Sequence, residues 1–274
     1  MGTNLITPSG SYERINELFQ RLYLPFAAKR YPEILEKAVA SEMSLAEFIE
    51  TVLLVEEEGR DKRSARTLLK MAGLPAVKTV DEYDFSFSTG INKQQIMDLA
   101  TMRFIEKASN VIFIGDSGVG KTHLSIALAY EATKNRIKTK FITAADLLIQ
   151  LQTAKKAKRY DEYIKRVVLS PRLLVIDEIG YFPMSREDAN HFFQVISRRY
   201  ERGSVVLSSN LPFSKWSHIF ADDTVITTAI LDRLLHHSVV INMQGESYRL
   251  KEKRKEGFMN LSNKNKSIRG GMPI

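Results

Sequence analysis

The sequence contains no cysteine among its 274 residues. This absence excludes disulfide bonds, thiolate metal sites and thiol-based catalysis together. The chain also lacks any uninterrupted apolar stretch near the roughly 20 residues that a membrane-spanning helix requires. Its N-terminus has no basic segment followed by an apolar one, as a secretory signal would. We therefore expect a cytoplasmic protein that does not interact with a membrane.

Acidic residues are fewer than basic ones, 32 against 40, which leaves a net charge of +8. Such a surplus favours a polyanionic partner, because clustered lysines and arginines release counterions from phosphates when they bind. The surplus is uneven, since residues 249–269 carry eight basic and two acidic side chains. A second locally basic stretch is a candidate DNA contact, with Arg60, Lys62, Arg63 and Arg66.

The pattern of the sequence changes along the chain. Residues 1–10 are predicted to be disordered, and residues 11–75 have apolar side chains at helical spacing, which predicts an all-helical domain of about four helices. Residues 76–90 are interpreted as a linker with aromatic side chains, and residues 251–274 as a flexible basic tail. The N-terminal domain is a candidate for binding DNA or a partner.

Residues 91–250 alternate between helical stretches and short apolar runs. The runs lie at 111–114, 139–142, 172–176, 204–208 and 238–242. This alternation predicts an α/β domain with a parallel sheet of five strands covered on both faces. Ligands of such sheets bind at the carboxyl ends of the strands.

A phosphate-binding loop follows the first of these runs. It matches the pattern G-x-x-x-x-G-K-[ST] at every fixed position, with Gly115, Asp116, Ser117, Gly118, Val119, Gly120, Lys121 and Thr122. The glycines allow backbone N–H groups to face the phosphates of ATP, and Lys121 can reach the β and γ phosphates. Thr122 would bind Mg²⁺, and the helix that follows adds its dipole to the anion site.

Two carboxylates end the third apolar run. Asp177 suits a contact with Mg²⁺, and Glu178 is suited to polarise a water molecule for attack on the γ phosphate. The alternative is a strand that ends in acidic surface residues. After the fourth run, Asn210 could orient the same water, or it could be a turn residue before Pro212.

Arginines near the end of the α/β region are candidates for stabilising negative charge in the transition state. Arg233 lies on the helix after the fourth run, and Arg249 follows the fifth. Arg198 and Arg199 are more simply interpreted as solvated ends of a helix. His236 and His237 are adjacent and should diverge on a helix, which argues against a shared metal site.

The stretch 153–166 is a second candidate DNA surface. If it forms one helix, its basic side chains fall roughly on one face and could follow a phosphate backbone. The candidate residues are Lys155, Lys156, Lys158, Arg159, Lys165 and Arg166. The alternative is a solvated helix partly neutralised by Asp161 and Glu162.

Together these motifs carry a family resemblance. The phosphate loop, residues 173–178 and 208–210, with 84–87 and 100–105 before them, resemble the IstB family of insertion-sequence transposition helper ATPases. This family is related to the helicase loader DnaC and the initiator DnaA, all AAA+ ATPases. The resemblance implies an ATPase that forms a homo-oligomer on duplex DNA and helps a transposase of the IstA kind select its target.

The resemblance also assigns roles to the late arginines. Arg233 matches the family's arginine finger, which completes the ATP site of a neighbouring subunit, and Arg249 resembles a second sensor of the nucleotide. Two other functions stay open at this point. One is a DnaC-like loader of a replicative helicase, and the other is a nucleotide-gated DNA scaffold whose hydrolysis is incidental.

Overall fold

The computed structural model describes residues 9–86 and 90–248. The chain divides into two compact units between Thr67 and Leu68. This division falls inside a helix, ahead of the segment 76–90 that the sequence analysis interprets as a linker. The predicted tail at 251–274 and most of the predicted disordered N-terminus lie outside the described residues, although residues 9 and 10 already belong to the first helix.

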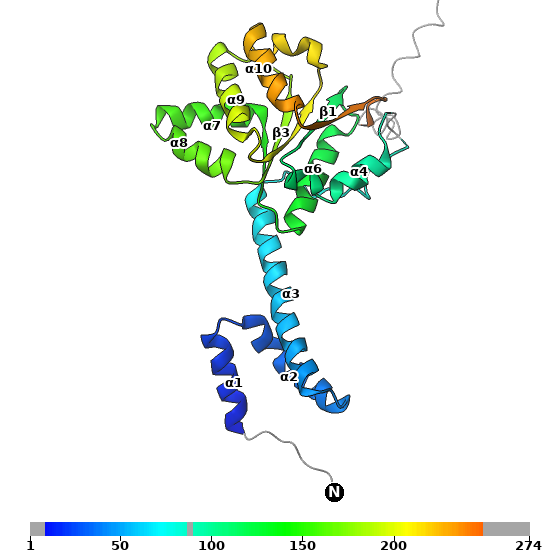
Figure 1. The fold of residues 1–274 in the computed structure, drawn as a ribbon, viewed down its shortest axis with the longest axis vertical. Helices are drawn as coiled ribbons and strands as arrows, with labels where there is room; N and C mark the ends of the chain where they lie inside the picture. The colour runs from blue at the N-terminus through cyan, green and yellow to red at the C-terminus, as the bar shows by residue number, and fades with distance from the viewer. Residues whose placement is uncertain (1–8, 87–89, 249–274) are drawn as a thin grey trace, which may run out of the picture. The chain divides into compact units, whose positions relative to one another are not determined.

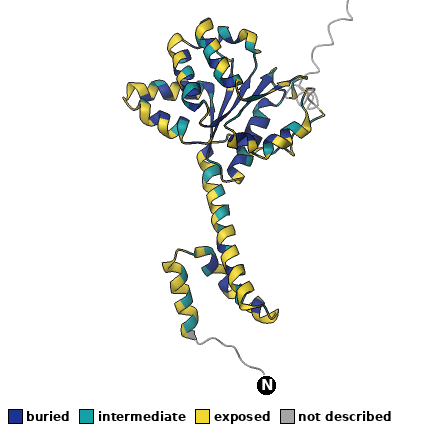
Figure 2. Cartoon of the chain, in the orientation of Figure 1, coloured by how far each residue is buried: buried dark blue, intermediate teal, exposed yellow. Residues whose placement is uncertain are grey.

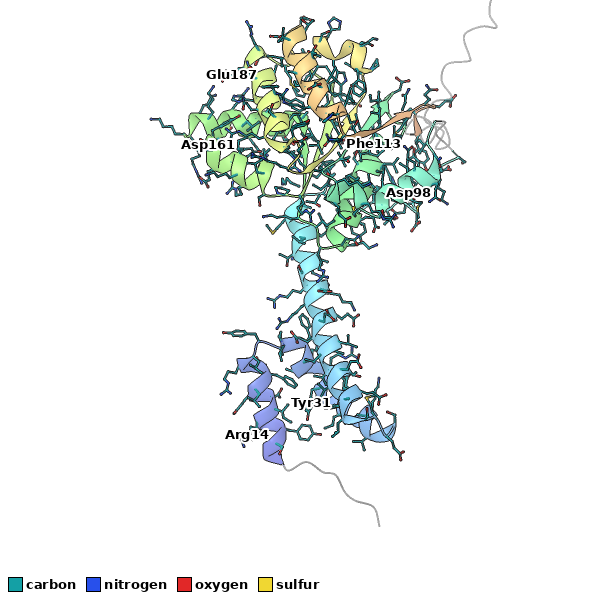
Figure 3. All side chains as sticks on the ribbon, in the orientation of Figure 1. Arg14, Tyr31, Asp98, Phe113, Asp161 and Glu187 are labelled. Carbon is teal, nitrogen blue, oxygen red and sulfur yellow. The ribbon has the colours of Figure 1, made fainter. Side chains whose placement is uncertain are left out.

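The first unit contains helices α1 (Ser9–Arg21) and α2 (Pro25–Ala40) and most of α3 (Leu45–Ala72). The prediction of about four helices is therefore wrong, because the basic stretch after Gly59 continues α3. Gly59 does not interrupt the helix; it leaves room for the ring of Phe26, which a Cβ there would approach to 2.1 Å. Tyr31 fills the centre of this unit, edge-on to Phe19 and Phe48 (Figure 3).

The second unit is built on a sheet of five parallel strands in the order β2-β3-β4-β1-β5 (Figure 1). The strands are β1 (Asn110–Gly115), β2 (Thr139–Thr143), β3 (Leu173–Ile179), β4 (Ser204–Ser209) and β5 (Ser238–Met243). They coincide with the five apolar runs, so the predicted fold class is confirmed. β3, β4 and β1 are central and buried, which explains why their sequences are almost continuously apolar.

Helices cover both faces of the sheet, and each face has its own apolar core (Figure 2). Alternate residues of one strand enter different cores, as Ile112 and Phe113 do. One face is covered by α4 (Lys93–Ala100), α5 (Arg103–Glu106) and α6 (Lys121–Lys134). The other is covered by α7 (Ala144–Lys156), α8 (Tyr160–Tyr163), the π-helix η1 (Ile164–Leu169), α9 (Arg186–Arg199), the 3₁₀ helix η2 (Phe213–His218) and α10 (Thr224–Leu235).

Membrane-spanning character is absent from the part of the chain that the structure describes. Within residues 9–86 and 90–248, every helix is too short or too polar to cross a bilayer. The helices instead bury one side against an apolar core and expose the other, as Figure 2 shows for the second unit.

Candidate nucleotide site

The phosphate loop joins the end of β1 to the start of α6. Gly120 precedes the helix with a φ of 99°, a left-handed conformation that suits glycine, and a Cβ there would lie 2.5 Å from the ring of Tyr83. Lys121 is only 5 % exposed, and its Nζ donates hydrogen bonds to the carbonyl oxygens of Gly115 (2.6 Å) and Asp116 (2.7 Å). The lysine is thus held against the loop whose N–H groups would receive phosphates.

Asp177 meets the loop through Thr122. The Thr122 hydroxyl donates to Oδ2 of Asp177 at 2.9 Å, and the hydroxyl of Ser208 donates to Oδ1. The three residues come from α6, β3 and β4, which meet because β4 lies between β3 and β1 in the sheet. Hydroxyl and carboxylate oxygens are the ligands that Mg²⁺ prefers, so the chemistry of Thr122 and Asp177 suits this ion, and their role as its ligands stays a prediction.

Ser208 is a site residue that the sequence analysis did not single out. It is buried, and besides bonding Asp177 its hydroxyl accepts a hydrogen bond from the backbone N–H of Glu178 at 3.0 Å. The two serines that end β4 after three apolar residues were the available signal in the sequence. Ser208 therefore orients both carboxylate residues of the neighbouring strand.

Glu178 differs from its neighbour in backbone and in exposure. The pairing of β3 with β4 shifts register between Ile176 and Ile179, and Glu178 has a left-handed φ of 66° inside this bulge. A regular strand would send the side chains of 177 and 178 to opposite faces of the sheet. The bulge instead lets the exposed Glu178 line the same cavity as Thr122.

That cavity has a volume of about 590 Å³ and lies over the phosphate loop. Besides the loop and Glu178, it is lined by Lys78, Glu82, Tyr83, Asp84, His123, Tyr181 and Tyr248. Four of these residues come from the segment interpreted as a linker, so sequence reasoning missed their part in the cavity. The aromatic content of that segment was the only signal.

Tyr83 fixes this segment against the phosphate loop. The Tyr83 side chain is 8 % exposed, and its hydroxyl donates to the carbonyl oxygen of Val119 at 3.0 Å. Its ring packs edge-on to His123, whose Nε2 lies 2.9 Å from the carbonyl oxygen of Thr79. His123 thus ties α6 to the same segment.

Asn210 and Arg233 are not among the residues that line this cavity. The Oδ1 atom of Asn210 is buried beside Gly180 and has no hydrogen-bond partner within the described residues. Arg233 is half-buried near the amino ends of the strands, beside Asn110. Its Nη1 donates a hydrogen bond to the carbonyl oxygen of Ala229, and its guanidinium lies 4.9 Å from the centre of the Phe193 ring. Both assignments stay predictions, and Arg249 lies outside the described residues.

Arg199 is not the solvated helix end that the sequence suggested. It is 2 % exposed, and its guanidinium donates to the carbonyl oxygens of Val168, Pro171, Arg172 and Ser204. Burial lowers the pKa of Arg199 to about 10. The residue joins the end of η1 to the starts of β3 and β4, which is a structural role.

The basic residues at 155–166 do not lie on one helix, so the single-face premise is wrong. α7 ends at Lys156, and Lys158 adopts a left-handed φ of 56°. The N–H groups of Lys158 and Arg159 then bond back to the carbonyls of Lys155 and Ala154, which is a Schellman motif. Lys165 and Arg166 lie on η1, a π-helix whose hydrogen bonds span five residues instead of the four of an α-helix.

Carboxylates also neutralise some of these candidates. Lys155 pairs with Glu187 at 2.8 Å and Arg159 with Glu162 at 2.8 Å, and each of these hydrogen-bonded ion pairs raises the pKa of its basic partner. Within residues 9–86 and 90–248, no ion pair is found for Lys156, Lys158, Lys165 or Arg166. In α3, Arg60 and Lys62 pair with Glu56 and Glu58, whereas Arg63 and Arg66 form no such pair there.

Comparison with known proteins finds a family whose model matches most of the chain. The family model described as "IstB-like ATP binding protein" matches residues 18–256. The chain is 43 % identical, over 88 % of its length, to a protein of insertion sequence IS5376 from Geobacillus stearothermophilus that is named for ATP binding, and it covers 96 % of that protein. It is equally identical, over 88 % of its length, to the corresponding IS21 protein of Pseudomonas aeruginosa, of which it covers 91 %.

Solved structures resemble the chain in fold. The replication initiator DnaA bound to AMPPCP and single-stranded DNA superposes with a TM-score of 0.54 at 18 % identity, over 70 % of this chain and 58 % of that one. DnaI superposes with a TM-score of 0.52 at 19 % identity, over 61 % of this chain and 91 % of that one. At these identities the likeness concerns the fold alone.

Proposed function

The chain belongs to the IstB-like family of insertion-sequence ATP-binding proteins, with an AAA+ P-loop fold, and we propose that it is a Mg²⁺-dependent ATPase that assists a transposase. In this proposal ATP drives its assembly on duplex DNA, and the assembly marks the target site. The observation that carries the proposal is that Thr122 and Glu178 line one cavity while the buried Asp177 accepts a hydrogen bond from Thr122. A protein that only bound ATP would not need Glu178 there.

The site residues divide the hydrolysis reaction among them. The N–H groups of the loop and Lys121 hold the phosphates, while Thr122 and Asp177 would hold Mg²⁺, whose charge neutralises the β and γ oxygens. Glu178 accepts a proton from water as the water oxygen bonds to the γ phosphorus and ADP leaves. The bulge in β3 supports this role, because it turns Glu178 toward the loop.

The remainder of the cavity suits the nucleoside. Tyr83 and His123 offer aromatic surface next to the phosphate loop, and Lys78, Glu82 and Asp84 offer polar groups. Because Tyr83 bonds the carbonyl of Val119, nucleotide binding would act on the segment 78–84 as well as on the loop. This link gives the first residues of the second unit a way to respond to ATP.

The position of Arg233 supports an ATP site that is shared between subunits. The arginine lies away from the cavity of its own chain, beside Asn110 at the start of β1, whereas the phosphate loop follows the end of β1. An arginine that acts on ATP from this position must act on the ATP of a neighbouring copy. The proposed oligomer therefore places Arg233 of one subunit at the γ phosphate of the next.

The family supports the insertion-sequence role over the loading of a replicative helicase. Relatives that are 43 % identical to this chain belong to insertion sequences, whereas the replication initiator DnaA resembles it in fold alone. A transposase and duplex DNA are accordingly the proposed partners, and the cytoplasm the proposed location. Preference for single-stranded DNA together with capture of a replicative helicase would instead favour the loader.

Assembly on DNA tests the proposal. We expect the full chain with ATP and duplex DNA to form large complexes in light scattering and electron microscopy, and Lys121→Ala to form none, because the phosphates lose their cationic partner. Lys134→Ala, at the exposed end of the same helix, is the matched control and should assemble normally. Equal assembly by Lys121→Ala would refute nucleotide gating.

A further inference from the structure

Two turns bring three metal-ligating side chains together at the surface of the second unit. Glu201 follows α9, and His236 and His237 follow α10. Each of the three offers one ligand atom, and these atoms all lie within 4.8 Å of one another. No other group of this size and proximity is found among residues 9–86 and 90–248.

The two histidines do not diverge as their adjacency suggested. α10 ends at Leu235, and His236 is its C-cap, with helical backbone angles and its N–H bonded to the carbonyl oxygen of Asp232. The ring centres lie 4.1 Å apart at an angle of 44°. The backbone carbonyl of His237 accepts a hydrogen bond from Asn110 at 2.7 Å, which fixes this turn against the start of β1.

Tyr200 holds His236 in place. Its hydroxyl lies 2.7 Å from Nδ1 of His236, and the two rings are stacked with their centres 5.9 Å apart. Glu201 has a left-handed φ of 57°, which turns the chain at the end of α9. An outer partner that orients ligands in this way is a regular feature of metal sites.

We propose that Glu201, His236 and His237 bind a divalent transition metal ion of the Zn²⁺ class, with Tyr200 as the outer partner. Two imidazoles and one carboxylate are a ligand set that such ions accept, whereas Mg²⁺ and Ca²⁺ prefer oxygen alone. Ligand atoms on one tetrahedral zinc lie about 3.3 Å apart, given bonds of about 2 Å. All three side chains are exposed and can close that distance by rotation.

The site lies beside Arg233. Tyr200, Glu201 and His237 line the same small recess as Arg233, at the edge of the sheet away from the phosphate loop. A bound ion would join the turn after α9 to the turn after α10 and so restrain the helix end that carries Arg233. This consequence rests on the proposed function, because it changes ATP hydrolysis only if Arg233 completes a neighbouring site.

Cobalt titration tests the site without any need for ATP hydrolysis. The full chain, freed of metals by a chelator and kept in excess Mg²⁺, is titrated with Co²⁺ and followed by visible absorption, then with Zn²⁺ in competition. Mg²⁺ occupies oxygen-rich sites but competes poorly for imidazole. We expect one Co²⁺ per chain, displaced by Zn²⁺.

Substitutions identify the ligands. His236→Ala, His237→Ala and Glu201→Gln should each weaken binding at least about tenfold, and Tyr200→Phe should weaken it by about 10 to 100-fold as an outer partner. His218→Ala is the matched control, since His218 is an exposed histidine that pairs with Asp222 elsewhere on the unit. It should bind Co²⁺ as the unchanged chain does.

Two results would overturn the site: no stoichiometric Co²⁺ binding by the unchanged chain, or binding that none of the ligand substitutions weakens. Circular dichroism and thermal unfolding without metal show which variants are folded, and the exposed Glu201→Gln change keeps the test decisive if a histidine variant fails to fold. A chain that binds Co²⁺ but does not hydrolyse ATP would refute the proposed function and leave the metal site standing.

Discussion

At the scale of single residues, Asp177 and Glu178 show how neighbouring carboxylates acquire different surroundings. Asp177 is 2 % exposed and accepts hydrogen bonds from the hydroxyls of Thr122 and Ser208, an environment that holds a carboxylate still for a metal ion. Glu178 is exposed; its backbone N–H donates a hydrogen bond to the Ser208 hydroxyl, and its side chain lines the cavity. Only the second is placed to exchange a proton with water.

Changing Glu178→Gln should therefore abolish hydrolysis while preserving ATP binding. We expect kcat to fall by about 10² to 10⁴, the usual contribution of a general base, because the amide cannot accept the proton. ATP-bound assemblies should then persist on DNA, which filter binding with labelled ATP and DNA can follow over time. Glu106→Gln, an exposed glutamate on α5, is the control and should turn over ATP normally. Normal disassembly of the Glu178→Gln complexes would support incidental hydrolysis instead.

Arg199 illustrates the opposite case, a charged residue without a chemical role. Its two Nη groups donate to four carbonyl oxygens in the interior, so the residue connects η1, β3 and β4. Gly203 leaves the space for it, since a Cβ there would meet Nη2 of Arg199 at 2.6 Å. Charge in the sequence therefore does not by itself identify a binding surface.

At the scale of elements, the end of α7 decides which basic residues are available to DNA. The Schellman motif after Lys156 turns the chain, and ion pairs with Glu187 and Glu162 occupy Lys155 and Arg159. Figure 3 labels Glu187 together with Asp161, which pairs with Arg198 at 3.5 Å. Lys158, Lys165 and Arg166 form no ion pair within residues 9–86 and 90–248, so they keep more of their charge for a phosphate backbone.

Two sets of substitutions separate these groups. Replacing Lys158, Lys165 and Arg166 by Ala should weaken duplex binding and flatten its salt dependence by about one unit of slope for each phosphate that is no longer neutralised. Replacing Lys155 and Arg159 should have a smaller effect, because these residues must first leave their carboxylates. Fluorescence anisotropy of labelled duplex over a range of salt concentrations measures both. Equal slopes for all three proteins would remove this region from the DNA surface.

At the scale of the whole molecule, the position of Arg233 predicts that a single chain cannot complete its own ATP site. The arginine lies near the amino ends of the strands, whereas the phosphate loop lies at their carboxyl ends. Arg233→Ala should lower kcat about 10³-fold or more without loss of ATP binding, as removal of an arginine finger does. Arg198→Ala, which removes a half-buried arginine paired with Asp161, is the control.

Mixing separates a shared site from a local one. Lys121→Ala and Arg233→Ala chains should each be inactive alone, yet a mixture should regain part of the DNA-stimulated ATPase activity, because some interfaces then combine an intact loop with an intact Arg233. A phosphate-release assay over a series of mixing ratios measures this. No recovery at any ratio, with both variants still assembling alongside unchanged chain, would contradict the shared site.

The sequence by itself determined the strands, the phosphate loop, the paired carboxylates and the family. These features are local: each depends on the hydrophobic pattern of one segment or on glycines that permit one turn. Only the tertiary structure decided the roles of Ser208 and Tyr83, the burial of Arg199 and the pairing of Lys155. Each of these depends on a contact between residues that the fold brings together from distant segments, which no local pattern records.

The same reason explains the two expectations that were wrong about helices. A local pattern cannot show that the ring of Phe26, from α2, fills the space beside Gly59. Nor can it show that α7 ends in a Schellman motif around Lys158. The rings of His236 and His237 likewise lie together at the end of α10, and Glu201 reaches them from a separate turn. Local sequence specified the segments and their chemistry, and tertiary packing decided which side chains share a site.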